Sequence, residues 1–377
     1  METFLRLVGL IAGLGILVST AVSVFTALVV PRATSSRAMR TVARVIGGTT
    51  RRILPRLSSY ERRDRLMSFV GPASMIFLFV LWLGSLVLGF GLVTWWSSGV
   101  NLGAALEIAG SSVFTLGIAT SPGSASRALE IIAAGVGLLV VALEIAYLPA
   151  LYTAFAMRET DVTLLATRAG TPAWGPEILA RHHMVDNIDE LPALYSAWER
   201  WAAAISESHT NYPALIWFRS PVASRSWLLS LVAVMDSAAL YHAVTPSQAP
   251  RQARLCLSMG TNCLRSVAGA LNVPFDPDPL PTAGTRLTKE EFVHGFERLG
   301  EVHFPLERSV DDAWRHFQGW RVNYESIVDV LTTLIMPPPA PWFLSRPSLG
   351  RAEWPAVRNR TPDDPEAARA FGPREAP

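Results

Sequence analysis

The second half of the chain contains acids and histidines of the kind that hydrolytic and metal sites use. Glu207 and His209 are two residues apart, so on a helix their side chains point in different directions. Asp236 and His242 are six apart and also miss a shared face. The sequence has no phosphate loop, dinucleotide fingerprint or Gly-x-Ser-x-Gly turn. We therefore predict a protein that is not an enzyme, with no catalytic residue, no metal site and no cofactor.

The most site-like patch of this half is "SESHTNYP" at 206–213. It places an acid, a histidine, an amide and a phenol at the predicted end of a helix: Glu207, His209, Asn211 and Tyr212. Two interpretations are open. The patch either senses a ligand or caps the helix end.

Composition limits the class of protein. The 377 residues are 50% apolar and 17% charged, below the roughly 25% charged residues of soluble proteins. The apolar residues are concentrated in blocks, which indicates a chain that is part membrane and part soluble. A net charge of +2 gives no nucleic-acid signal. Cys256 and Cys263 are seven residues apart, about 10 Å on a helix and too far for a disulfide, which suits a reducing cytoplasmic location.

Three apolar segments are long enough to cross a bilayer, which takes about 20 residues. They cover 4–30, 69–96 and 129–155, and the second ends in the interfacial motif "TWW". Ten arginines lie between the first two segments, at 31–67, whereas 97–128 contains Arg127 alone. The positive-inside rule therefore places the first loop and everything after Met157 in the cytoplasm, with the N-terminus outside. The basic loop is either a topology signal alone or also binds anionic lipid headgroups.

Between the second and third segments lies the uncharged stretch "SSVFTLGIATSPGS" at 111–124. Residues 102–114 have the apolar spacing of a helix of about three turns, and the Gly- and Pro-containing run after them cannot continue it. Non-helical backbone at membrane depth is tolerated only where protein or water covers it. The pattern predicts a re-entrant pore loop over 101–124.

This layout resembles the pore domain of potassium channels, whose filter begins Thr-x-Gly. Thr115, Leu116 and Gly117 match the first three filter positions, and Ile118, Ala119 and Thr120 stand where the family has Tyr, Gly and Asp. The chain is closer still to bacterial ion-channel-like membrane proteins, in "FTLG", "YLPALY" and "MRE…LLATRAGTP".

The resemblance implies a homotetramer in a bacterial inner membrane, with the loop carbonyls coordinating a monovalent cation. Ala119 and Thr120 lack the glycine and the carboxylate of the family. A non-conducting signalling or scaffold protein with an inherited pore fold therefore stays open as the alternative, and a membrane-anchored enzyme is the third possibility.

Five residues are candidates for supporting the pore or its gating. Gly135, Gly137 and Pro149 either allow close packing and bending of the inner helix or reflect the ordinary composition of spanning helices. Glu144 lies deep in the third segment, where an acid faces a cavity or a partner, or is bonded between helices. Glu107 either braces the loop or faces the outer surface.

The remaining chain reads as amphipathic helices, so we predict an all-α protein: membrane helices with a re-entrant loop, plus a helical cytoplasmic domain. Residues 226–244 are apolar enough for a fourth span, but Asp236 in their middle favours a buried core helix. The Pro-rich tail should be largely disordered and dock through Trp342 and Phe343. The predicted parts are a first spanning helix (1–30), an Arg-rich loop (31–67), a pore module (68–157), a cytoplasmic domain (158–336) and the tail (337–377).

Overall fold

The structure is a computed structural model, and it describes residues 1–28, 30, 59–121, 123–281 and 283–343. In these ranges the regular elements are helices, which confirms the all-α class. Most of the predicted Arg-rich loop, 31–58, and the tail beyond Phe343 lie outside the described residues.

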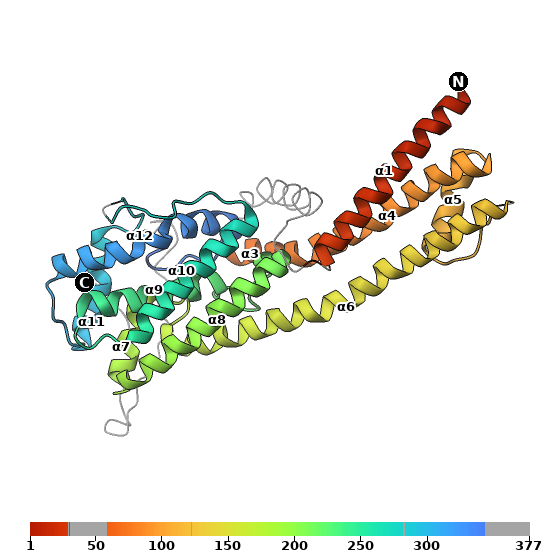
Figure 1. Cartoon of the computed structure of the whole chain (residues 1–377). Coiled ribbons are helices and arrows are strands. Elements are labelled where there is room, and N and C mark those ends of the chain that lie inside the picture. Colours follow the sequence, from red (N-terminus) through yellow and green to blue (C-terminus); the bar gives the residue numbers. More distant parts are fainter. Residues whose placement is uncertain (29, 31–58, 122, 282, 344–377) are drawn as a thin grey trace. The chain divides into compact units, whose positions relative to one another are not determined.

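The chain divides into two units, and helix α6 (Ser124–Ala169) contributes to both (Figure 1). The first unit takes residues 1–58 and 66–154, and the second takes 59–65 and 155–377. The first unit holds α1 (Glu2–Leu28), α4 (Val70–Ser98), α5 (Leu102–Val113) and the first part of α6.

The second unit begins with most of α3 (Tyr60–Ser68) and the end of α6. Its other α-helices are α7 (Gly175–Met184), α8 (Leu191–Asn211), α9 (Trp227–Val244), α10 (Arg251–Leu271), α11 (Lys289–Glu301) and α12 (Val310–Ile335).

Helices α1 and α4 pack against each other in antiparallel register. Arg6 of α1 donates to the carbonyl of Trp95 at 3.3 Å, and Ser23 accepts a hydrogen bond from the indole of Trp82 at 3.1 Å. Between these pairs, a Cβ at Gly13 would lie 2.8 Å from the carbonyl oxygen of Gly89, so the backbones approach closely.

Large apolar side chains of the first unit are exposed, for example Ile76 of α4 and Ile131 of α6 at 65% and 74%. In the described residues four helices are long and apolar enough to cross a membrane, which identifies a multi-pass membrane protein. Three of them belong wholly or partly to the first unit, and the fourth is α9.

Helix α9 is the centre of the second unit. All of its residues except His242 are buried, and α7, α8, α10 and α12 pack around it. This is the arrangement predicted for a core helix, and it explains why an apolar stretch of this length carries Asp236 in its middle.

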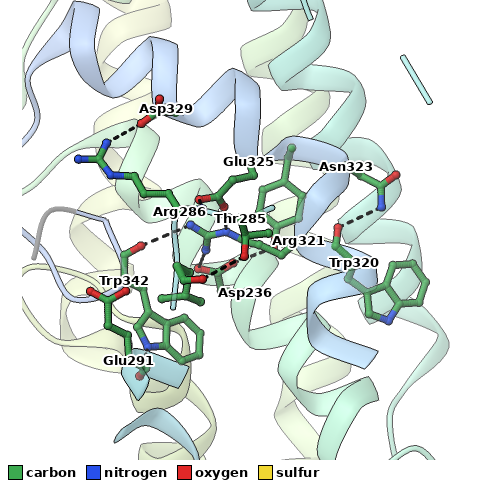
Figure 2. A network of polar contacts seen from close by, with 12 residues as sticks. Asp236, Thr285, Arg286, Glu291, Trp320, Arg321, Asn323, Glu325, Asp329 and Trp342 are labelled. Atoms are coloured by element: carbon green, nitrogen blue, oxygen red, sulfur yellow. Dashed lines mark hydrogen bonds and ion pairs between the residues drawn. The ribbon is translucent and has the colours of Figure 1, made fainter. Parts of the chain in front are cut away.

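Asp236 is neutralised by a cluster of side chains from α12 (Figure 2). Arg321 is ion-paired with both Asp236 and Glu325, and the hydroxyl of Tyr324 donates to Asp236 at 2.7 Å. Burial disfavours the charge of Arg321, but the two carboxylates outweigh it and raise the pKa of the guanidinium above its usual value. Burial raises the pKa of Asp236 to about 6, so at neutral pH both partners of the pair are charged inside the core.

The cluster also fixes the segment after α12. Arg321 donates to the carbonyl of Trp342 at 3.4 Å, and its guanidinium carbon lies 4.8 Å from the ring centre of Phe343. The Trp342 indole donates to the carbonyl of Glu291 at 2.9 Å, and both rings are buried. The segment up to Phe343, which belongs to the predicted tail, is thus held in the core by Trp342 and Phe343, the two residues predicted to dock it.

We predict that Arg321→Met destabilises the second unit by about 3–5 kcal/mol, because it leaves buried carboxylates without a counter-charge. The control is Arg315→Met, which breaks an exposed pair with Asp312 and should cost less than about 1 kcal/mol. Urea unfolding of the full chain in detergent, followed by circular dichroism, measures both. Equal midpoints for the two variants would show that the buried pair is not what holds α12 to α9.

Candidate functional site

The candidate site is built on α5, a helix too short to cross a membrane. Its twelve residues span about 18 Å, against about 30 Å for the hydrocarbon core. Asn101 caps its start by accepting a hydrogen bond from the amide of Ala104 at 2.9 Å. After Val113 the chain leaves the helical region, because Thr115 and Gly117 have φ values of 55° and 68°.

Helix α5 runs back along α4. A Cβ at Gly91 would lie 2.5 Å from the side chain of Leu106, and one at Gly110 would lie 3.8 Å from Val87. As the chain advances along α5 from Leu106 to Gly110, its contacts move backwards along α4 from Gly91 to Val87. The two helices are therefore antiparallel, and α5 ends beside a point of α4 well before Ser98.

The end of α5 also meets the interior of α6. A Cβ at Gly137 would lie 2.2 Å from the carbonyl oxygen of Val113. Gly137 is thirteen residues into α6, about 20 Å from its first residue. Further along the loop, the amide of Ser121 donates to the carboxylate of Glu130 at 2.6 Å. The loop thus leads back from the level of Gly137 toward the start of α6.

The six filter-like residues lie in this returning segment. Thr115, Leu116, Gly117, Ile118 and Thr120 are exposed in the single chain, with Ile118 at 74%, and Ala119 is half-buried. The amide of Ala119 donates to the hydroxyl of Ser111 at 3.1 Å, which ties the loop to α5. The family has glycines at the positions of Gly117 and Ala119. In this chain Gly117 takes a left-handed conformation and Ala119 does not.

Of the five support residues, the structure brings Gly137 to the loop and separates Gly135 from it. Gly137 is buried against Val113, whereas a Cβ at Gly135 would meet open space. Glu144 is half-buried and follows Gly137 at helical spacing, on the face of α6 that packs against protein. Pro149, inside α6, and Glu107, on α5, are exposed.

Glu130 is a site residue that the sequence analysis did not single out. An acid within an apolar helix, a few residues after a loop without charges, was the available signal.

The patch at 206–213 does not form one surface. Glu207 is exposed, Asn211 and Tyr212 are half-buried, and His209 is completely buried at the end of α8. Nε2 of His209 lies 3.3 Å from the Arg158 guanidinium, and Nδ1 lies 3.1 Å from the hydroxyl of Ser208. Burial and the charge of Arg158 place the pKa of His209 well below its usual value, so the ring is neutral.

Arg158, which follows the third apolar segment in the sequence, is 1% exposed. It is paired with Glu159 at 2.8 Å and donates to the carbonyls of Leu215 and Phe218 at 2.9 and 2.8 Å. The end of α6 is thereby anchored in the core of the second unit.

In the described ranges no group of three or more His, Cys, Asp or Glu residues is placed to hold a metal ion. Cys256 and Cys263 are free and buried, and burial raises the pKa of both thiols to about 12.

Comparison with known proteins adds no family, because no protein-family model, curated protein or solved structure matches the chain. The resemblance to potassium channels therefore remains a prediction from the residues quoted above.

We predict that Gly137→Ala destabilises the first unit by about 1–3 kcal/mol, because the added methyl meets the backbone of Val113. Gly135→Ala is the matched control, and should be neutral or stabilising by up to about 1 kcal/mol through helix propensity. Thermal unfolding of the two variants in detergent separates them. If both lose the same stability, the contact between α5 and α6 does not have the proposed closeness.

We further predict that His209 contributes a loss of stability to the second unit as the pH falls below about 6.5. The folded-state pKa of His209 is depressed, so below that pH the unfolded chain binds a proton that the folded chain does not. The slope is at most about 1.4 kcal/mol per pH unit for this group. His209→Gln should flatten the dependence of the unfolding midpoint on pH between 7 and 5, whereas His294→Gln, at an exposed position, should leave it unchanged. Equal slopes in the wild type and the His209→Gln variant would contradict the assignment.

Proposed function

We propose that the chain is one subunit of an oligomeric, potassium-channel-like membrane protein, in which α5 and the loop after it re-enter the membrane and line a path for monovalent cations. The observation that carries the proposal is the position of α5 relative to its two neighbouring helices, α4 and α6. It runs backwards along α4 and ends against Gly137, well inside α6. A connection lying outside the membrane would have no reason to reach that far along either helix.

The need for an oligomer follows from the same geometry. Backbone groups of the loop at membrane depth require water or neighbouring protein, since lipid offers them no hydrogen bonds. Leu116 and Ile118 are exposed in the single chain, so the loop backbone around Gly117 is open to its surroundings. One loop cannot enclose a pore, and four copies around an axis, as in the family that the sequence resembles, provide both the cover and the path.

In such an assembly each part of the chain has a separate role. Carbonyl oxygens and threonine hydroxyls of 115–120 replace water around a dehydrated cation. Glu144, on the protein-facing side of α6, is placed to influence the cation further along the path. The second unit, held to α6 by Arg158, is the cytoplasmic domain that biases opening. We place it on the cytoplasmic side of a bacterial inner membrane, with the N-terminus outside.

A non-conducting signalling or scaffold protein is the second candidate, and a specific observation favours it. Ala119, which stands where the family has its second filter glycine, is not in the left-handed region, and the side chains at 116 and 118 are large and apolar. An assembly with this loop can keep the fold of a pore without a continuous ring of carbonyl oxygens.

We predict that the purified full chain is a tetramer in detergent and gives a potassium flux in proteoliposomes. Gly117→Ala should reduce the flux at least tenfold, because an L-residue at φ 68° costs about 1–2 kcal/mol in each subunit. Gly15→Ala, where a methyl meets open space, is the control and should leave the flux intact.

The outcomes separate the two functions. A tetramer without flux supports the scaffold, whereas a monomer in several detergents contradicts both. Equal flux in the Gly117 variant and the wild type would remove the loop from the conducting path.

A further inference from the structure

The second unit contains an open groove of about 380 Å³ between α10 and α12. Its volume falls within the range of small-molecule sites, about 300–1,000 Å³. The α10 side is a stripe at helical spacing, formed by Arg254, Ser258, Thr261 and Arg265 together with Asn262. The α12 side is formed by Trp320, Asn323 and Tyr324.

The charged side chains that line the groove are all positive. Two arginines line it and no acidic side chain does. Within the described part of the chain, neither Arg254 nor Arg265 has a carboxylate partner. Arg265 donates to the carbonyl of Pro277 at 2.7 Å, but its Nε is buried without an acceptor among those residues. Together with the hydroxyls of Ser258 and Thr261, the groove offers hydrogen-bond donors to an anion.

The groove also has a flat aromatic wall. The Trp320 ring is half-buried, and the guanidinium carbon of Arg254 lies 5.8 Å from its centre. Asn323 lies beside it and is held in place, because its amide donates to the carbonyls of Gly319 and Trp320 at 3.1 and 3.0 Å (Figure 2). A planar ring bound here can stack on the indole and accept from the guanidinium.

The floor of the groove is rigid. Tyr324 lines it, and the hydroxyl of the same residue donates to Asp236 in the buried cluster with Arg321. The wall that a ligand would contact is therefore fixed by the core of the unit, so little ordering is needed on binding.

From these features we propose that the groove binds a small organic anion that combines a flat ring with a phosphate, that is, a nucleotide. The ring stacks on Trp320, and the phosphates are bound by the guanidiniums of Arg254 and Arg265. The Cα atoms of these arginines are about 16 Å apart along α10, which suits an extended molecule with two recognition groups better than a single inorganic ion. This inference does not depend on whether the membrane unit conducts ions.

The test is equilibrium dialysis of the full chain in detergent against labelled ATP without magnesium, with adenosine and inorganic phosphate as competitors. Saturable binding of one ATP per chain is expected, with adenosine and phosphate each competing more weakly than unlabelled ATP. Arg254→Gln should weaken binding about tenfold or more, because it removes a charge-assisted hydrogen bond. Arg251→Gln removes the same charge one helical turn away, outside the groove, and should leave the affinity unchanged.

Trp320→Phe should retain more affinity than Trp320→Ala, and unchanged circular dichroism shows that each variant is folded. The absence of saturable ATP binding would overturn the proposal, as would equal losses in the Arg251 and Arg254 variants. Displacement of ATP by phosphatidylglycerol vesicles, at lower concentration than by unlabelled ATP and not by phosphatidylcholine vesicles, would instead identify a lipid headgroup site and also overturn it.

Discussion

An amide or carbonyl group surrounded by hydrocarbon needs a hydrogen-bond partner within the protein, and the arrangement around α5 depends on that requirement. Helix α5 satisfies its own backbone over twelve residues and ends at Val113. Beyond it, side chains take over: Ser111 accepts from the amide of Ala119, and Glu130 accepts from that of Ser121. The amides of Thr115 and Leu116 donate to the carbonyls of Ser112 and Ser111, whereas the described residues offer no acceptor to the amides of Gly117 and Ile118, which are left for water or a neighbouring chain. In the proposed oligomer, neighbouring chains and a water-filled interior would supply the missing hydrogen-bond partners.

The same requirement shapes the core of the second unit, where arginines supply donors that irregular segments lack. Arg321 reaches the carbonyl of Trp342, and Arg158 reaches those of Leu215 and Phe218. The accepting carbonyls all lie outside the α-helices, and each guanidinium is also paired with a carboxylate. A buried ion pair contributes little net stability, but it fixes which irregular segment lies against which helix.

The sequence predicts those features of the fold that depend only on neighbouring residues. Segment length and the Gly- and Pro-containing run identified the apolar helices and the end of α5, and Asp236 identified α9 as a core helix. Tertiary register was not accessible in this way. Gly135 and Gly137 look equivalent in the sequence, and only the approach of α5 distinguishes them. Arg158 reads as a topology signal and His209 as part of a surface patch, because no local pattern reveals that distant helices bury both.

Helix α6 joins these two sets of interactions, since it carries Gly137 in the first unit and Arg158 in the second. Between them lies Pro149, which has no amide hydrogen, so the carbonyl of Ile145 lacks its helical donor. The hydroxyl of Thr153 donates to the carbonyl of Pro149 at 2.8 Å, in addition to the backbone bonds of this turn. A helix bends where its hydrogen bonding is weakest. In the proposed channel, a displacement of the core around Arg158 would be passed along α6 either as a shift of the whole helix or as a bend at Pro149. Gly137, packed against Val113, is the point at which α6 would transmit it to the loop.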